Sequence, residues 1–228
     1  MCELYERAGQ LAEQGTHVVG TDEKTGMQAL QRLHPDIPMG PGRVRGREFE
    51  YVRHGTMCLI ANLEIWCGHV TAPSVGPTRT EADFKAHVEQ TVNTGPQAGW
   101  VFIVDNLDTH QSESLVLYVA QACGVEEDLG VKGKSGVLAS KASRKAFLSD
   151  PSHRIRFAYT PRHCSWLNQI EIWFGVLSRK LLRRASFASA AELKERVLEF
   201  IEYFNRTMAK PIKWLYSPRP LKDPPSSG

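Results

Sequence analysis

Residues 99–106 (GWVFIVDN) constrain the fold more than any other segment, because an uninterrupted apolar run there ends in an acid and an amide. A short apolar run without polar alternation is typical of a strand that is buried on both faces, as at the centre of an α/β sheet. No apolar run in the chain approaches the ~18–20 residues that a membrane helix needs. The sequence therefore predicts a mixed α/β domain with this strand at its centre.

Periodic apolar residues predict the elements around this strand. The three early strands follow one another closely and are expected to form an antiparallel meander, with a hairpin turn at residues 67 and 68. The expected strands are residues 16–22, 56–66, 69–75, 99–104 and 154–160. The expected helices are residues 3–14, 80–93, 115–123, 142–148, 165–184 and 189–208.

The helix at 165–184 carries one apolar stripe at spacings of three and four residues, which predicts a single buried face. Ser165 is expected to cap its start, and Asn168 is expected to share a side of the helix with Glu171. The stripe consists of Leu167, Ile170, Phe174, Leu177 and Leu181.

Three acids stand out by their positions. Asp22 is expected at the end of the first strand, Asp105 at the end of the central strand, and Glu171 at the border of the buried helical stripe. Clustered carboxylates repel one another unless cations neutralise them, and hard cations such as Mg²⁺ prefer oxygen ligands. Two such ions, roughly 3.5–4 Å apart, can activate an attacking oxygen and stabilise a leaving oxygen at a phosphodiester. Together the acids are candidates for such a site.

Each acid, taken singly, also fits a plainer role. An Asp at a strand end commonly forms a turn or caps a helix, and a helical Glu commonly lies on a solvated face. Asp108 is a better candidate than Asp105 for capping the next helix, which leaves Asp105 available for chemistry. The residue pattern by itself leaves both interpretations of the acids open.

Three motifs together resemble a known family. The segments VGTDEKTGMQAL, VFIVDNLDTH and PRHCSWLNQIEIWFGVLSRKLLRR are similar to the catalytic domain of bacterial insertion-sequence transposases of the mariner-like superfamily. The resemblance runs from about residue 17 to residue 216. It implies an α/β ribonuclease-H-like fold, with a mixed five-stranded sheet flanked by helices.

The resemblance also implies the chemistry. Asp22, Asp105 and Glu171 would be the D-D-E triad, which holds two Mg²⁺ (or Mn²⁺) ions. The enzyme would cleave a DNA strand at the end of an insertion element and then transfer the freed 3′-hydroxyl to target DNA. Residues expected beside the triad, supporting it, are Asn106, His110 and Asn168.

The sequence departs from the family pattern in two places. The separation of Asp105 and Glu171 is longer than usual, and the excess falls in the Gly-, Ser- and Lys-rich segment 124–150, which is interpreted as a surface insertion. The N-terminal helix-turn-helix region that recognises element ends is expected to be missing. The expected organisation is an N-terminal helical remnant at 1–16, the catalytic domain at 17–216 and a disordered, proline-rich tail at 217–228.

Basic side chains gather in three segments, although the net charge is only +3. Those in 124–150 fit either phosphate contacts or a solvated face. Two further segments are expected to contact the DNA backbone, which positions a duplex without reading its sequence. The expected DNA-binding residues are Arg43, Arg45, Arg47, Arg53, Arg179, Lys180, Arg183 and Arg184.

The expected partners are double-stranded DNA, as element ends and target, and a second copy of the chain in a dimeric working complex. Five widely spaced cysteines without a C-x-x-C pair indicate reduced thiols, and no secretory signal is visible. A cytoplasmic, nucleoid-associated bacterial protein is therefore expected, with no membrane partner. Two alternatives remain open: a truncated remnant that binds DNA without catalysis and regulates transposition, and a related nuclease that only hydrolyses.

Overall fold

A mixed five-stranded sheet forms the centre of the molecule. The computed structural model describes residues 2–34, 37, 39–42, 44, 46, 50–161, 164 and 167–212. The strand order is β3-β2-β1-β4-β5, in which β1 pairs antiparallel with β2 and parallel with β4. The predicted meander is confirmed, and the apolar strand β4 is buried as predicted. The expectation that β4 lies at the centre of the sheet is wrong, because β1 is the middle strand and β4 lies between β1 and β5. The strands are β1 (Thr16–Arg32), β2 (Tyr51–Glu64), β3 (Val70–Gly76), β4 (Gly99–Val104) and β5 (Ile155–Tyr159).

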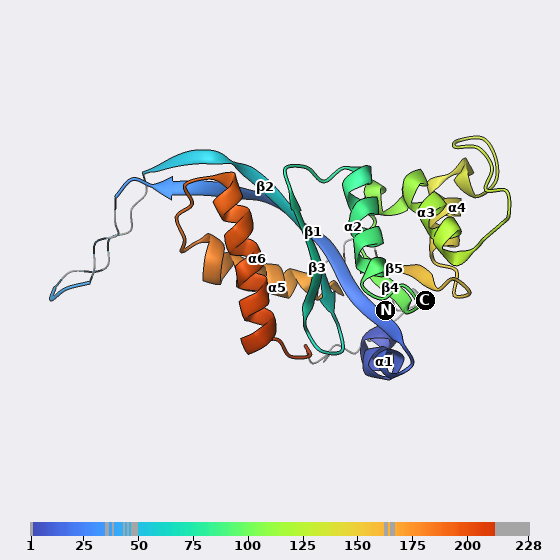
Figure 1. Ribbon diagram of the computed structural model, residues 1–228, viewed down its shortest axis with the longest axis horizontal. Coiled ribbons are helices and arrows are strands. Elements are labelled where there is room, and N and C mark those ends of the chain that lie inside the picture. The colour runs from blue at the N-terminus through green and yellow to red at the C-terminus, as the bar shows by residue number, and fades with distance from the viewer. Residues whose placement is uncertain are drawn as a thin grey trace, which may run out of the picture.

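Helices cover both faces of this sheet (Figure 1). Alternate residues of β4 divide between the faces, as the pleat of a strand requires. Phe102 packs with α2 and α3, whereas Val101 and Ile103 pack with α1. The long helices are α1 (Cys2–Glu13), α2 (Glu81–Asn93), α3 (Glu113–Cys123), α4 (Lys141–Leu148), α5 (Ile170–Leu177) and α6 (Ala190–Thr207).

Strand β1 is much longer than the sequence predicts and runs across most of the molecule in Figure 1. Asp22 therefore lies inside the strand, and the expectation that it ends the strand is wrong. Two register shifts in the pairing with β2, one of them around Gly26 with φ of 67°, interrupt the regular alternation of side chains. Because these bulges break the period of two, residues 27–32 do not read as a strand in sequence.

The penultimate helix is shorter than predicted. Helix α5 ends at Leu177 and continues as a π-helical turn, Ser178–Leu182. The predicted stripe is confirmed, since its five residues are all buried. Asn168 precedes α5 instead of sharing a side of it, and the proposed cap Ser165 lies outside the described residues.

The expected role of Asp108 as a helix cap is also wrong. Asp108 begins a short 3₁₀ helix, η1 (Asp108–Gln111), and Ser112 caps α3 by accepting a hydrogen bond from the Leu115 N–H. The segment 124–150 contains a second short 3₁₀ helix, η2 (Val137–Ala139), followed by α4. The predicted tail at 217–228 lies outside the described residues.

None of the helices in the described part of the chain combines the length and the apolar character needed to cross a bilayer.

Candidate active site

The register of β1 and β4 brings two of the predicted acids together. These parallel strands pair Val19 with Phe102 and Gly20 with Ile103. Asp22 lies two residues after Gly20, and Asp105 lies two residues after Ile103. Both side chains therefore begin at the same level of the sheet and project from the same face. That face is the one that α1 and α5 cover. The juxtaposition follows from parallel pairing, which carries both strands toward the same edge of the sheet.

Asp105 is held in place by its neighbours. Its carboxylate accepts a hydrogen bond from the Leu107 N–H at 2.8 Å and contacts the His110 Nδ1 at 2.8 Å. The other ring nitrogen of His110 lies 3.1 Å from Glu23 Oε1, so the imidazole bridges two carboxylates. The side chains of His110 and Glu23 are 0% and 2% exposed, respectively. The bridge is therefore a buried element of the site and not a surface ion pair.

The pKa values of the bridged groups reflect this arrangement. Burial lowers the pKa of His110, but hydrogen bonds to Asp105 and Glu23 and the charges of both acids outweigh burial and raise it to about 9. Burial raises the pKa of Asp105, yet the hydrogen bonds from His110 and Leu107, with the charges of His110 and Arg79, lower it overall. At neutral pH the structure thus favours an imidazolium between two carboxylates.

Asp22 is in the opposite electrostatic situation. Burial is the main cause that raises its pKa to about 7, and the charges of Asp105, Glu23 and Glu171 raise it further, against a single hydrogen bond from the Glu23 N–H. The carboxyl of Asp22 therefore lies in a field with an excess of negative charge. A divalent cation is the species that would neutralise such a field.

Glu171 lies in the first turn of α5, and its side chain is exposed, contrary to the expectation that it borders the buried face. Its charge still acts on Asp22. Among the described residues, however, no three His, Cys, Asp or Glu side chains are arranged as a ready-made metal site.

The turn before α5 is anchored to β1, next to Asp22, and to α1. Asn168 donates a hydrogen bond to the Thr21 carbonyl at 2.9 Å, and the Tyr5 hydroxyl of α1 donates to the Leu167 carbonyl at 2.5 Å. Gly20 makes this approach possible, because a Cβ there would lie 2.7 Å from Asn168 Oδ1. The predicted supporting residue Asn168 thus connects Glu171 to the strand that carries Asp22.

The donor set fits a hard divalent ion. Asp22, Asp105 and Glu171 offer carboxylate oxygens, and the charges of Asp105 and Glu171 add to burial in raising the pKa of Asp22. The His110 nitrogens both face carboxylates, which makes them bridging groups and not additional metal ligands. Oxygen ligands alone favour Mg²⁺ or Mn²⁺ over zinc.

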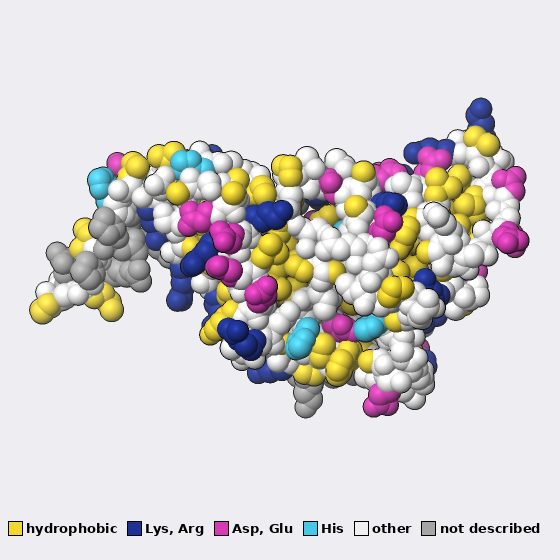
Figure 2. Space-filling view, in the orientation of Figure 1, with side chains coloured by type: hydrophobic (Ala, Val, Ile, Leu, Met, Phe, Trp, Pro, Cys, Tyr) yellow, Lys and Arg dark blue, Asp and Glu magenta, His cyan; other side chains and the backbone are white. Residues whose placement is uncertain are grey.

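Some of the predicted DNA-binding residues lie beside Glu171. Arg179 and Arg183 line a cavity of about 260 Å³ together with Glu171 and Lys24. Lys180 lines a different, mostly apolar cavity, and Arg53 interacts with the ring of Tyr51. Arg184 is exposed. The predicted residues Arg43, Arg45 and Arg47 lie outside the described residues. In Figure 2, Lys and Arg side chains are visible both over the α5–α6 half and over the 124–150 segment.

Sequence reasoning missed two residues of this site, Glu23 and Lys24. They directly follow Asp22, and successive residues of a strand point to opposite faces. Glu23 therefore meets His110 on the α2 side, whereas Lys24 returns to the face of Asp22 and reaches the cavity beside Glu171. The sequence signal for these two residues is the alternation of side chains between the two faces of β1. This alternation can be applied to Glu23 and Lys24 only if the strand is expected to continue past Asp22.

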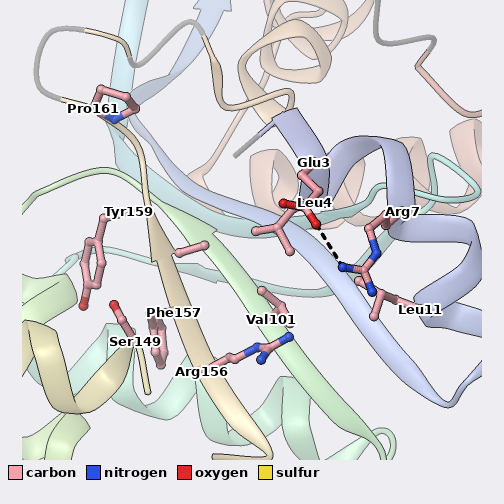
Figure 3. A pocket seen from close by; sticks show the side chains of 11 residues that line it. Glu3, Leu4, Arg7, Leu11, Val101, Ser149, Arg156, Phe157, Tyr159 and Pro161 are labelled. Carbon is pink, nitrogen blue, oxygen red and sulfur yellow. Dashed lines mark hydrogen bonds and ion pairs between the residues drawn. The ribbon is translucent and has the colours of Figure 1, made fainter. Parts of the chain in front are cut away.

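Another cavity, of about 560 Å³, lies under α1 against β4 and β5 (Figure 3). Its lining combines apolar side chains such as Leu4 and Val101 with the charged groups of Arg7 and Arg156. Arg7 forms an ion pair with Glu3 across one helical turn. None of the predicted site residues lines this cavity, so it is separate from the carboxylate cluster.

The sheet order and the helices on both faces define an α/β ribonuclease-H-like domain. A model of the DDE superfamily endonucleases matches residues 17–194, and the chain belongs to that family. The match confirms that part of the resemblance inferred from the three motifs which concerns the DDE catalytic domain. A comparison with curated proteins finds no sequence match.

Two solved structures are similar to this chain. The Mos1 mariner paired-end complex with Mn is similar with a TM-score of 0.53 and 13% identity, covering 88% of this chain and 52% of that chain. The Mos1 transposase paired-end complex with left transposon end gives a TM-score of 0.49 and 11% identity, covering 88% and 55%. The chain thus spans about half the length of these transposases. The first similarity supports the ribonuclease-H-like fold.

Proposed function

We propose that this chain is the catalytic domain of a DNA transposase that cleaves a strand at the end of a mobile element and joins the freed 3′-hydroxyl to target DNA. The observation that carries the proposal is the parallel register of β1 and β4. This register places Asp22 and Asp105 at the same level of the sheet, on the face covered by α5. Membership of the DDE endonuclease family supports the same assignment.

Asp22, Asp105 and Glu171 would hold Mg²⁺ or Mn²⁺, two ions in total. When bound, these ions would supply Lewis-acid activation of the attacking oxygen and charge stabilisation of the leaving oxygen at a phosphodiester. His110 keeps the Asp105 carboxylate fixed, and Asn168 ties the start of α5 to β1. Asn106 fixes the loop that follows Asp105, because its side chain donates to the Thr160 carbonyl at 2.7 Å.

Arg179, Arg183 and Lys24 would bind phosphates of the DNA that leads into the site, because they line one cavity with Glu171. The other predicted DNA-binding residues would extend this path along the duplex. The working complex would be a dimer of this chain on element ends and target DNA, at the bacterial nucleoid. The similar Mos1 structures are paired-end complexes, which supports such an assembly.

The experiment that tests the proposal is strand cleavage of DNA with Mn²⁺, comparing wild type with Asp105→Asn. We expect the substitution to reduce the rate about a thousandfold or more, because it removes a metal-binding charge without changing shape. Asp128→Asn is the matched control, because this acid is exposed, lies away from the 105–111 loop and accepts a local hydrogen bond from the Gly130 N–H. Equal cleavage by wild type and Asp105→Asn would remove Asp105 from the site.

Strand transfer needs a second readout. A labelled oligonucleotide with a free 3′-hydroxyl should appear joined to target DNA in the same reaction. Cleavage without joined product would instead identify a nuclease that only hydrolyses. DNA binding that is equal with and without chelator, and without any cleavage, would identify a non-catalytic DNA-binding protein.

A further inference from the structure

Helix α4 lies in the segment 124–150, which the family pattern does not explain. Its start is well defined, because Ser140 caps it and forms a reciprocal capping box with Ser143. Three cations, Lys141, Arg144 and Lys145, follow at spacings of three and four residues, so they share one side of the helix.

All three cations reach the loop that follows β4. Arg144 is buried and donates from Nε to the Gln111 carbonyl at 2.7 Å. Lys145 donates to Asn106 Oδ1 at 2.6 Å and lies over the ring of Tyr159, 4.6 Å from its centroid. Lys141 pairs with Asp108 at 2.7 Å. One short helix thus holds residues 106, 108 and 111 of the same loop.

The macrodipole of α4 does not account for all three cations. Lys145 lies in the last turn, where positive charge is favourable, but Lys141 lies at the N-terminus, where positive charge is unfavourable, and the first turn has no acid. Nor are these side chains free for DNA, as one interpretation of the sequence allowed, because each already bonds to the loop. Their placement is therefore explained by the loop that they bind.

The loop is the one that positions the site. Asn106 is held at both ends of its side chain, by Lys145 at Oδ1 and by the Thr160 carbonyl at Nδ2. The Tyr159 hydroxyl, beneath Lys145, donates to the His110 carbonyl at 2.7 Å. Asp105 immediately precedes these contacts, and His110 lies among them and bonds to the Asp105 carboxylate.

We propose that α4 is a positioning element of the active site, in which Lys145, through Asn106, and Arg144, through Gln111, fix the 105–111 loop. The segment 124–150 is then a functional part of the domain and not a surface excursion. This inference rests on the proposed function for its catalytic consequence, whereas its effect on the loop can be measured without any activity.

The test compares Lys145→Met, which keeps the length of the side chain and removes its charge, with Lys145→Arg, which keeps the charge. Lys134→Met is the matched control, because Lys134 is an exposed cation of the same segment and its side chain makes no hydrogen bond or ion pair with the described residues. All variants are first compared with wild type by thermal unfolding, so that a folding defect is recognised.

Two readouts decide the result. In the metal-free protein, hydrogen exchange of the 105–111 amides should be at least about tenfold faster in Lys145→Met, and unchanged in Lys134→Met. In Mn²⁺-dependent cleavage, the rate at saturating DNA should fall about ten- to a hundredfold in Lys145→Met while KM for DNA changes less than about twofold, because a loosened loop misplaces Asp105. Lys145→Arg should restore most of both properties.

The opposite outcomes are equally specific. Unchanged loop exchange in Lys145→Met would overturn the proposal. A second result would also overturn it: a raised KM for DNA in Lys145→Met with an unchanged rate at saturating DNA. If the slope of log binding constant against log salt concentration also became shallower by about one, the lost interaction would be a phosphate contact. If the wild type failed to cleave DNA at all, the proposed function would fall, and faster loop exchange in Lys145→Met would still support the positioning role.

Discussion

The two sides of the carboxylate cluster are built differently. On the β4 side, Asp105 is bonded to His110 and Leu107, and His110 in turn is bonded to the buried Glu23. On the α5 side, Glu171 is exposed in the first turn of its helix, and only the preceding turn is anchored, through Asn168 and Leu167. The Asp105 carboxylate on the β4 side is thus held rigidly. The position of the Glu171 carboxylate on the α5 side depends only on where this helix begins.

This difference indicates how such a site can be both stable and adaptable. Charges that are buried and bonded contribute to the fold, so their loss should cost stability as well as activity. An exposed carboxylate contributes little to the fold, so its loss should affect activity alone. Separating stability from activity, residue by residue, therefore tests whether the two sides differ as described.

The largest expected effect on stability is at the buried bridge. His110→Ala should lower the free energy of unfolding by about 3–5 kcal/mol, because it leaves two carboxylates without their shared cation. Chemical denaturation at pH 7 measures this, with the exposed His34→Ala as control. A loss below about 1 kcal/mol would mean that water replaces the imidazole easily and that the β4 side is not rigid.

A second effect depends on pH. The folded-state pKa of Asp22 is about 7, against 3.8 for the free group, so the folded protein binds the extra proton. Its stabilising contribution is complete below about pH 4 and is lost as pH rises through about 7. Asp22→Asn should therefore be about 2–4 kcal/mol more stable than wild type at pH 8 without metal, and about equal at pH 4.

Divalent ions sharpen this prediction. Adding Mg²⁺ at pH 8 should stabilise wild type and leave Asp22→Asn nearly unchanged, because the ion neutralises the same excess charge that the substitution removes. Thermal unfolding at both pH values, with and without Mg²⁺, gives the comparison. A wild type that is as stable at pH 8 as the variant, in the absence of metal, would contradict the raised pKa of Asp22.

A smaller effect is expected where α1 supports the start of α5. Tyr5→Phe removes the hydroxyl that donates to the Leu167 carbonyl and keeps the buried ring. The expected cost is about 1–2 kcal/mol, because a buried carbonyl loses its donor. Tyr203→Phe is the control, because the Tyr203 side chain is exposed on the surface of α6. Equal unfolding midpoints for the two variants would show that α1 does not anchor this turn.

The smallest effect on stability should come from Glu171. Glu171→Gln should change the free energy of unfolding by less than about 0.5 kcal/mol, because the side chain is exposed. The same substitution should abolish Mn²⁺-dependent cleavage under the proposed function. A marked loss of stability would contradict the contrast between the two sides, and undiminished cleavage would remove Glu171 from the proposed triad.

Local sequence patterns were sufficient for most of the fold. The apolar run at 100–104 and the stripe of Leu167, Ile170, Phe174, Leu177 and Leu181 each depend on residues close in sequence, and the burial of both confirms the predictions. Asp22 was placed correctly on the first strand and wrongly at its end, because the bulged continuation of β1 is stabilised by pairing with β2. Pairing between strands is not visible in the period of a single strand.

The sequence by itself determined which acids are candidates, the α/β class of the fold and the family of the protein, because apolar periodicity and motif order are local properties of the chain. Only the tertiary structure decided which groups face one another: that Glu23 reaches His110, that α1 holds the turn before Glu171, and that α4 binds the loop after Asp105. The physical reason is that hydrogen bonds and ion pairs depend on distances in space, and residues 39 to 162 positions apart are brought within bonding distance only by the packed sheet and helices.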